Sequence, residues 1–307
     1  MRIYTLTLNP AYDIHATTAH FLPCKENLAA VTSRDAGGKG VNISRALHSG
    51  GTENTAVIVL GKENGGEFKE SLASFGLNCL YFEKEGRIRE NLTLHCETTG
   101  ETRISFAGFA VDERILDEVE TAMEVDEETF VTYTGRTPAG IPGESVKAFL
   151  KRLQAKGAKV VIDSKSFTLE DLFALRPWLI KPNQEEISEY LGRQIKDFSD
   201  TLDAARALWE GGIENVMISL GAQGALLVCD EGAFSAVPPS VSAVSTIGAG
   251  DSSIAGFLFA AEQGKNSPEM LRTAVSFGTA ACLTSGTKPP APSDVERILK
   301  DIKLNTL

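Results

Sequence analysis

The sequence lacks a basic excess, a paired-cysteine spacing and any apolar run long enough to span a membrane. Its amino terminus alternates like a strand over residues 1–8 and contains no signal-peptide core. The formal net charge of −11 argues against general affinity for nucleic acid or anionic membranes, because such partners require a basic field. We therefore expect a cytoplasmic protein that holds any anionic ligand with a few placed groups.

Cysteine is also scarce, and the residues at 24, 79, 96, 229 and 282 are scattered without a CxxC pair. A reduced cytosolic chain is the simplest interpretation. The P-loop spacing GxxxxGK[ST] and the dinucleotide fingerprint GxGxxG are both absent. These absences disfavour Walker-type and Rossmann-type nucleotide binding, and no internal repeat or low-complexity linker is present.

What the sequence does contain is a regular alternation of strand-like and helical segments. With 307 residues and 42% apolar composition, it can bury a large core as one domain, residues 1–307. Unalternating β-branched runs between amphipathic helices indicate a parallel sheet covered on both faces. We predict an α/β fold with a doubly wound, mainly parallel sheet flanked by helices. The strand-like runs are Ala56–Leu60, Thr129–Tyr133, Lys159–Asp163 and Asn215–Ser219, and the helical segments include Val146–Leu153 and Leu202–Trp209.

Two stretches, about 10–35 and 88–109, break this rhythm. Between Arg89 and Phe106, apolar and polar residues alternate before a turn at 98–101. Together the stretches predict a small antiparallel sheet inserted in the domain. It serves either as a lid over a ligand cleft or as a simple edge extension of the main sheet.

A glycine turn at Gly248-Ala249-Gly250-Asp251 leads into an apolar helix that ends near Gly264. Such a turn directs unpaired N–H groups of the helix amino terminus at one point, which favours an anion. Asp251 in the first turn is either a plain amino-terminal charge or a general base, and the flanking glycines favour the base. A second cluster, 37–42, resembles a phosphate cradle, although taken alone it is better explained as a tight strand-to-helix turn.

Taken in order, these motifs resemble those of the PfkB/ribokinase family of carbohydrate kinases along nearly the whole chain. The opening segment 7–13 and the glycine clusters at 37–42 and 248–251 are similar to family signatures. The resemblance implies an ATP-dependent and Mg²⁺-dependent kinase with a β lid, in which Asp251 is the catalytic base. Gly248, Ala249 and Gly250 would form the anion hole beside it.

Three later segments, at 181–186, 219–224 and 277–281, are similar to the nucleotide-binding parts of the family. The first of these is otherwise only a proline-terminated strand followed by a capped helix. Without the resemblance, the small residues of the last segment would indicate only close helix packing. The resemblance implies that the cofactor is bound by Lys181, Asn183, Ser219, Gly221, Gly224 and Gly278, with Glu186 acting on Mg²⁺ indirectly.

Lys39 and the run Arg89–Leu92 are similar to the phosphosugar branch of the family. The resemblance implies that this lysine and arginine hold the phosphate already on the sugar; without it, both belong on a solvated face. Arginine suits that task through its bidentate fork. The implied substrate is a phosphorylated ketohexose, chiefly fructose 1-phosphate or tagatose 6-phosphate, and the sequence does not decide between these and fructose 6-phosphate. The implied substrate-binding residues are Asp13, Gly37, Gly38, Lys39, Asn42, Arg89, Asn91 and Arg136.

Three positions depart from the branch pattern. Thr93 stands where 1-phosphofructokinase-like sequences usually have lysine, Arg136 lies in an altered glycine loop, and Ser245 replaces an Asn or Asp. Arg136 is either a compensating phosphate contact or a surface residue. A kinase for an unphosphorylated sugar or nucleoside, and a non-catalytic sugar-phosphate-binding regulator, remain the competing functions. The resemblance also implies a homodimer formed through the lid, which would protect strand edges.

Overall fold

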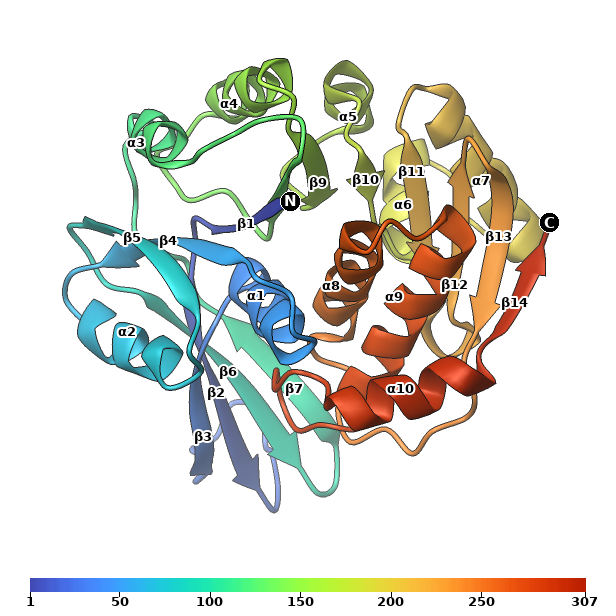
Figure 1. Cartoon of the computed structure of the whole chain (residues 1–307). Coiled ribbons are helices and arrows are strands. Elements are labelled where there is room, and N and C mark those ends of the chain that lie inside the picture. The colour runs from blue at the N-terminus through green and yellow to red at the C-terminus, as the bar shows by residue number, and fades with distance from the viewer.

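The computed structural model describes all 307 residues and contains one large sheet and one small sheet (Figure 1). The large sheet has ten strands, and the four strand-like runs predicted for the main sheet all lie in it. Across the sheet, the strands are β14 (Lys303–Thr306), β13 (Gly232–Val237), β12 (Ala225–Cys229), β11 (Asn215–Ser219), β10 (Leu179–Ile180), β9 (Lys159–Asp163), β8 (Thr129–Thr134), β1 (Arg2–Thr7), β4 (Thr55–Gly61) and β5 (Asn78–Lys84).

The large sheet is parallel from β5 to β11 and antiparallel from β11 to β14. This confirms the predicted mainly parallel sheet. Because parallel strands point the same way, the carboxyl ends of β1, β8 and β9 meet at one edge of the sheet, where ligands bind in open α/β folds.

Helices cover both faces of the large sheet, as Figure 1 shows. In β4, Val57 and Val59 face one apolar core, whereas Ile58 and Leu60 face the other side. Helices α3 to α7 pack on the first face, and α1, α2, α8, α9 and α10 pack on the second. The helices are α1 (Lys39–Ser49), α2 (Gly65–Ala73), α3 (Ile115–Ala122), α4 (Gly143–Ala155), α5 (Leu169–Leu175), α6 (Gln184–Leu191), α7 (Phe198–Glu210), α8 (Ala249–Glu262), α9 (Ser267–Ala281) and α10 (Pro292–Asp301), and a 3-10 turn spans Gly221–Gln223.

The small sheet projects from the body beside α1 (Figure 1). Its strands, in order, are β3 (Ala30–Gly37), β2 (Ala11–Thr18), β6 (Arg89–Cys96) and β7 (Gly100–Ser105). Both outer pairs are antiparallel hairpin-like ladders, as predicted, but the two ladders join through a parallel pairing of β2 with β6. The predicted turn lies between β6 and β7, where Gly100 has a φ of 82°.

Close packing of α8 against α9 fixes the helix that carries Asp251. A Cβ atom at Gly256 would lie 2.7 Å from the carbonyl oxygen of Thr273, so only glycine allows this approach. The helix ends two residues before Gly264, in agreement with the predicted glycine stop. No helix of the structure has both the length and the apolar character needed to cross a membrane.

Candidate active site

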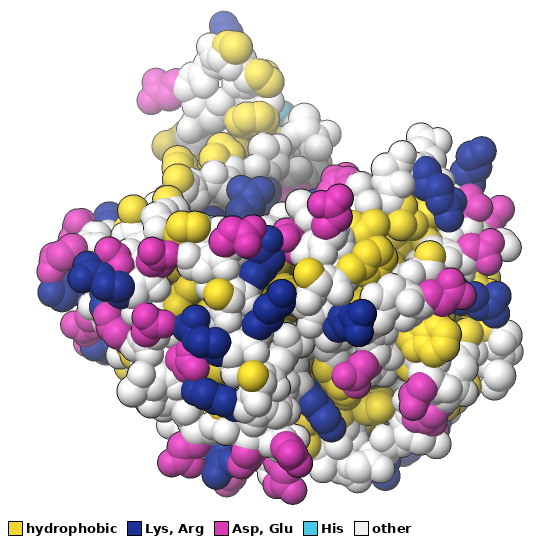
Figure 2. Space-filling view, turned by 90° about the horizontal axis from the view of Figure 1, so that it is seen from above, with side chains coloured by type: hydrophobic (Ala, Val, Ile, Leu, Met, Phe, Trp, Pro, Cys, Tyr) yellow, Lys and Arg dark blue, Asp and Glu magenta, His cyan; other side chains and the backbone are white.

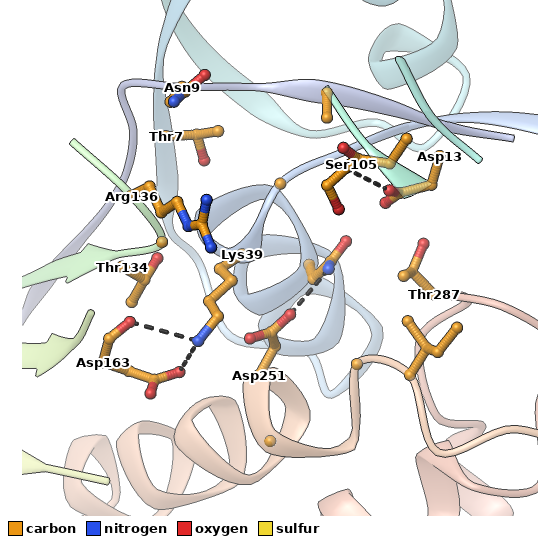
Figure 3. A pocket seen from close by; sticks show the side chains of 18 of the residues that line it. Thr7, Asn9, Asp13, Lys39, Ser105, Thr134, Arg136, Asp163, Asp251 and Thr287 are labelled. Atoms are coloured by element: carbon orange, nitrogen blue, oxygen red, sulfur yellow. Dashed lines mark hydrogen bonds and ion pairs between the residues drawn. The ribbon is translucent and has the colours of Figure 1, made fainter. Parts of the chain in front are cut away.

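A polar cavity of about 540 Å³ lies between the small sheet and the carboxyl ends of the large sheet's strands. Thr7, Thr134 and Asp163 enter it from the ends of β1, β8 and β9. Of its 24 lining residues, only two are hydrophobic, so it suits a small, highly polar ligand. Figure 3 shows charged side chains converging on this space from both sheets and from α1 and α8.

The amino terminus of α8 opens into this cavity. Gly248 precedes the helix with a φ of 79°, a left-handed conformation that favours glycine, and no side chain caps the helix. The N–H of Ala249 donates to the carbonyl of Thr246, while those of Gly250 and Asp251 have no acceptor. The predicted glycine turn is therefore present at the helix start; of its residues, Gly250 and Asp251 keep free N–H groups that could bind an anion, whereas that of Ala249 is occupied.

Asp251 is buried, with 6% of its surface exposed, in the first turn of α8. The Nδ2 of Asn42 donates a 2.8 Å hydrogen bond to Oδ2 of Asp251. Burial raises the pKa of Asp251 to about 6, the charge of Asp163 adds to the rise, and Lys39 and Asn42 oppose it. A carboxylate with such a pKa, facing a polar cavity, is suited to accept a proton near neutral pH.

Lys39 pairs with a carboxylate that the sequence analysis did not select. Its Nζ lies 2.8 Å from Oδ2 of Asp163, and Figure 3 shows it between Asp163 and Asp251. Lys181 approaches Oδ1 of the same aspartate at 3.9 Å. Burial works against charge on both groups, but nearby opposite charges outweigh it: Asp163 and then Asp251 raise the pKa of Lys39, and Lys181 and then Lys39 lower that of Asp163. Both groups are therefore charged.

A second set of charges lies where β2, β6 and β7 meet. Asn91 donates from Nδ2 to Oδ1 of buried Asp13 at 3.1 Å, and Nη2 of Arg103 lies 3.6 Å from the same oxygen. Arg89 donates long hydrogen bonds to the carbonyls of Asn9 and Phe106, at 3.4 and 3.3 Å. Its Nε is buried without a partner. This end of the cavity therefore combines a buried carboxylate with a cationic donor that has no partner.

The predicted glycine cluster makes room for these groups. A Cβ atom at Gly37 would lie 2.4 Å from Oδ2 of Asp13, so this glycine permits the approach of the carboxylate without lining the cavity itself. Gly38 does line the cavity and directly precedes α1 as its N-cap residue, with a φ of 127°. Arg136, whose role the sequence left open, lines the cavity and points into it (Figure 3).

A second cavity of about 430 Å³ adjoins the first, and Lys181, Asn183 and Gly250 line both. It is more apolar, with Met217 and Val275 among its walls. A Cβ atom at position 278 would lie 2.2 Å from a serine Oγ of α8, so close helix packing also applies there. The remaining predicted cofactor-binding residues, Ser219, Gly221, Gly224 and Gly278, line this second cavity together with Ala249.

Asn183 and Glu186 form the capping box of α6. The side chain of Asn183 accepts from the N–H of Glu186 at 2.8 Å, and Oε2 of Glu186 accepts from the N–H of Asn183 at 3.1 Å. The capped helix that the sequence allowed is therefore present. Both residues also line the first cavity, so their capping of α6 is compatible with a role in ligand binding.

Sequence reasoning missed Asp163 and Arg103. Asp163 ends a predicted buried strand, and a carboxylate at the carboxyl end of a parallel strand is a signal that could have been used. Arg103 follows the predicted turn on a short, mostly exposed strand and offered no such signal.

Comparison with known proteins agrees with this geometry. The family described as "pfkB family carbohydrate kinase" matches residues 7–294. The 1-phosphofructokinase of Escherichia coli K12 is 34% identical over 91% of this chain and 90% of its own length. The ATP-dependent 6-phosphofructokinase isozyme 2 of the same organism is 31% identical over 97% of this chain and 98% of its own. A crystal structure of phosphofructokinase-2 from Escherichia coli, in complex with substrates and products, superposes with a TM-score of 0.90 at 30% identity and covers 98% of this chain and 99% of that one.

Proposed function

This chain belongs to the pfkB family of carbohydrate kinases, and from that membership we propose that it transfers the γ-phosphoryl group of ATP to fructose 1-phosphate, forming fructose 1,6-bisphosphate. Membership makes it an enzyme that phosphorylates a hydroxyl group of a sugar phosphate. The observation that carries the finer proposal is the position of Asp251. This buried carboxylate faces the polar cavity, and the neighbouring Gly250 lines that cavity and the more apolar one.

In the proposed reaction, the sugar lies in the first cavity with a free hydroxyl against Asp251. The carboxylate accepts the hydroxyl proton, the sugar oxygen forms a bond to the γ-phosphorus, and the bond to the β-phosphate oxygen breaks so that ADP leaves with its electron pair. Lys39 and the N–H groups of Gly250 and Asp251 stabilise the charge on the transferring group. This gives Lys39 a role at the transfer point, since its partner Asp163 holds it there.

The nucleotide fits the second cavity. Its apolar walls suit a base, while Ser219, Gly221 and Gly224 leave room for a triphosphate to approach the backbone. No group of three or more His, Cys, Asp or Glu side chains could hold a metal ion unaided. Magnesium that arrives on nucleotide phosphates requires only one or two carboxylates, and Glu186 and Asp163 line the adjoining wall. Bound there, Mg²⁺ would neutralise phosphate charge.

The opposite end of the first cavity suits the body of the phosphosugar. Asp13 accepts hydrogen bonds and is positioned to orient sugar hydroxyls, while Arg89 and Arg136 offer donors to a phosphate. The buried Nε of Arg89 has no partner, which is costly without an anion, and Arg136 adds a second, solvent-exposed cation. They favour a phosphorylated substrate over a free sugar or nucleoside, and the retained carboxylate Asp251 favours an enzyme over a silent regulator.

Two further features complete the proposal. The small sheet acts as a lid, because it contributes Asp13 and Arg89 to the cavity while projecting from the body (Figure 1). It also carries exposed apolar side chains, visible on the protruding part in Figure 2, that a second copy of the chain would cover in a homodimer. These are Leu22, Leu28, Val31, Ile104 and Phe106. Because ATP is the proposed donor, we place the reaction in the cytoplasm.

The test is ATP turnover with Mg²⁺ on a panel of acceptors. Fructose 1-phosphate, tagatose 6-phosphate and fructose 6-phosphate would be compared with fructose, tagatose, ribose and adenosine under one set of conditions. We expect the highest kcat/KM with fructose 1-phosphate. A preference for another phosphosugar would correct the substrate and keep the reaction class. Turnover of unphosphorylated compounds alone would overturn the assignment.

A further inference from the structure

Arg103 on β7 lies directly opposite Thr93 on β6. Side chains alternate along a strand, so Arg103 shares the cavity face with Ser105, whereas Ile104 points to the other side. Thr93 shares the face of Arg89 and Asn91 but is buried and uncharged. The only cation of this cross-strand pair therefore comes from β7.

Arg103 is loosely held. Its Nη2 lies 3.6 Å from Oδ1 of Asp13, which is within ion-pair range but too long for a good hydrogen bond. The side chain is 45% exposed and makes no other contact of this kind. Asp13, by contrast, is firmly placed, because Asn91 donates to the same oxygen at 3.1 Å. The guanidinium can therefore move within the cavity while the carboxylate stays.

Arg103 belongs to a group of three arginines at this end of the cavity, with Arg89 and Arg136. Burial first, and then the positive charges of Arg136 and Arg103, lower the pKa of Arg89, which Asp13 opposes. Asp13 is the only carboxylate that acts on Arg89 in this way, and it brings one negative charge to a group of three positive ones. A phosphate dianion would balance them and accept bidentate hydrogen bonds.

We propose that Arg103 is a specificity-determining residue that exchanges its partner when the substrate binds. Its guanidinium moves from Asp13 to the phosphate already present on the sugar. It then binds that phosphate together with Arg89 and Arg136, so that the three arginines form a clamp. The exchange frees Oδ1 of Asp13 for a sugar hydroxyl at the same time. An unphosphorylated sugar offers nothing to replace the ion pair, so Arg103 stays on Asp13 and competes with the sugar for it. This inference rests on the proposed phosphosugar kinase activity.

The main variant is Arg103→Gln, measured with fructose 1-phosphate, fructose and ATP as varied substrates. Losing one charge-assisted contact raises the KM for fructose 1-phosphate by about ten- to a hundredfold. We expect kcat and the KM for ATP to change little, and kcat/KM for fructose to stay constant or rise. Arg87→Gln removes an exposed arginine of the same region that pairs with Glu90 outside the cavity, and it should change none of these values.

Two rescues separate a charge role from a structural one. Arg103→Lys should recover part of the affinity for fructose 1-phosphate. Thr93→Lys in the Arg103→Gln background should do the same, because it returns a cation to the facing position of the same strand pair. An unchanged KM for fructose 1-phosphate in Arg103→Gln, or an equal rise in the KM values for fructose and ATP, overturns this inference but leaves the proposed function standing. If the unaltered protein turns over none of the three phosphosugars, the proposed function fails and this inference with it.

Discussion

Asn42 and Asp251 are 209 positions apart in the sequence, yet the amide of one donates a 2.8 Å hydrogen bond to the carboxylate of the other. The bond joins the first turn of α1 to the first turn of α8, so both helix amino termini point at one space. It favours the charged form of a carboxylate that burial would otherwise neutralise. Much of the proposed chemistry depends on this contact.

The first prediction concerns the base itself. Asp251→Asn removes the proton acceptor while its amide oxygen can still accept from Asn42, so the fold should persist. We expect kcat to fall on the order of a hundredfold or more, the usual contribution of a positioned base. Steady-state kinetics with circular dichroism as a folding control would measure this. Near-complete retention of turnover would contradict the assignment.

Protonation of Asp251 should also determine how kcat falls on the acidic side of the pH–rate profile. With a pKa of about 6, the base is mostly protonated below that pH, so kcat should rise about tenfold per pH unit up to about 6 and then level off. Asn42→Ala removes a contact that favours the charged form and should move the inflection to higher pH. Matching pH profiles for the variant and the unaltered protein would show that the contact does not tune the base.

The same pKa shift predicts a stability effect. The folded-state pKa of Asp251 lies above its ordinary value of 3.8, so the folded state binds this proton more tightly than the unfolded chain. The contribution of this group to stability is therefore present below pH 4 and is lost as pH rises through about 6. At pH 8, Asp251→Asn should raise Tm by a few degrees, and at pH 4 the difference should shrink. Thermal unfolding at both values measures this, and an equal Tm change at both would argue against it.

A further prediction distinguishes two roles for Lys39, at the phosphoryl-transfer point or at the phosphate of the sugar. If it acts at the transfer point, as its pairing with Asp163 suggests, Lys39→Met should lower kcat by about a hundredfold and change the KM for the phosphosugar little. If it holds the sugar phosphate, the KM should rise instead. Lys39→Met leaves the buried carboxylate of Asp163 with only the longer contact to Lys181, so the double variant with Asp163→Asn should regain stability without regaining activity.

The exposed apolar side chains of the small sheet predict self-association. Leu28 is 93% exposed and Val31 67% exposed, which is unusual for such residues unless a partner covers them. Leu28→Asp should convert a dimer into a monomer, measured by size-exclusion chromatography with light scattering. Phe198→Ser, at an exposed apolar position on α7, is the matched control. A monomer before any substitution would refute the dimer.

Features set by local chain conformation were accessible from the sequence. Unalternating β-branched runs identified the buried strands, because such residues fit a sheet that is covered on both faces. Gly248 and Gly250 indicated a ligand-facing helix start, because their conformational freedom and missing side chains serve little purpose in an ordinary cap. The alternation after Arg89 likewise located the strands of the small sheet.

Tertiary structure alone decided which side chains meet. The sequence grouped Lys39 with Arg89, but the order of β8 and β9 brings Asp163 to Lys39 across 124 positions. Similarly, the register of β6 with β7 sets Arg103 against Thr93, and the parallel pairing of β2 with β6 brings Asp13 level with Asn91. Local patterns report backbone conformation and burial, whereas the pairing of charges depends on strand order and register, which are fixed only when the whole sheet assembles.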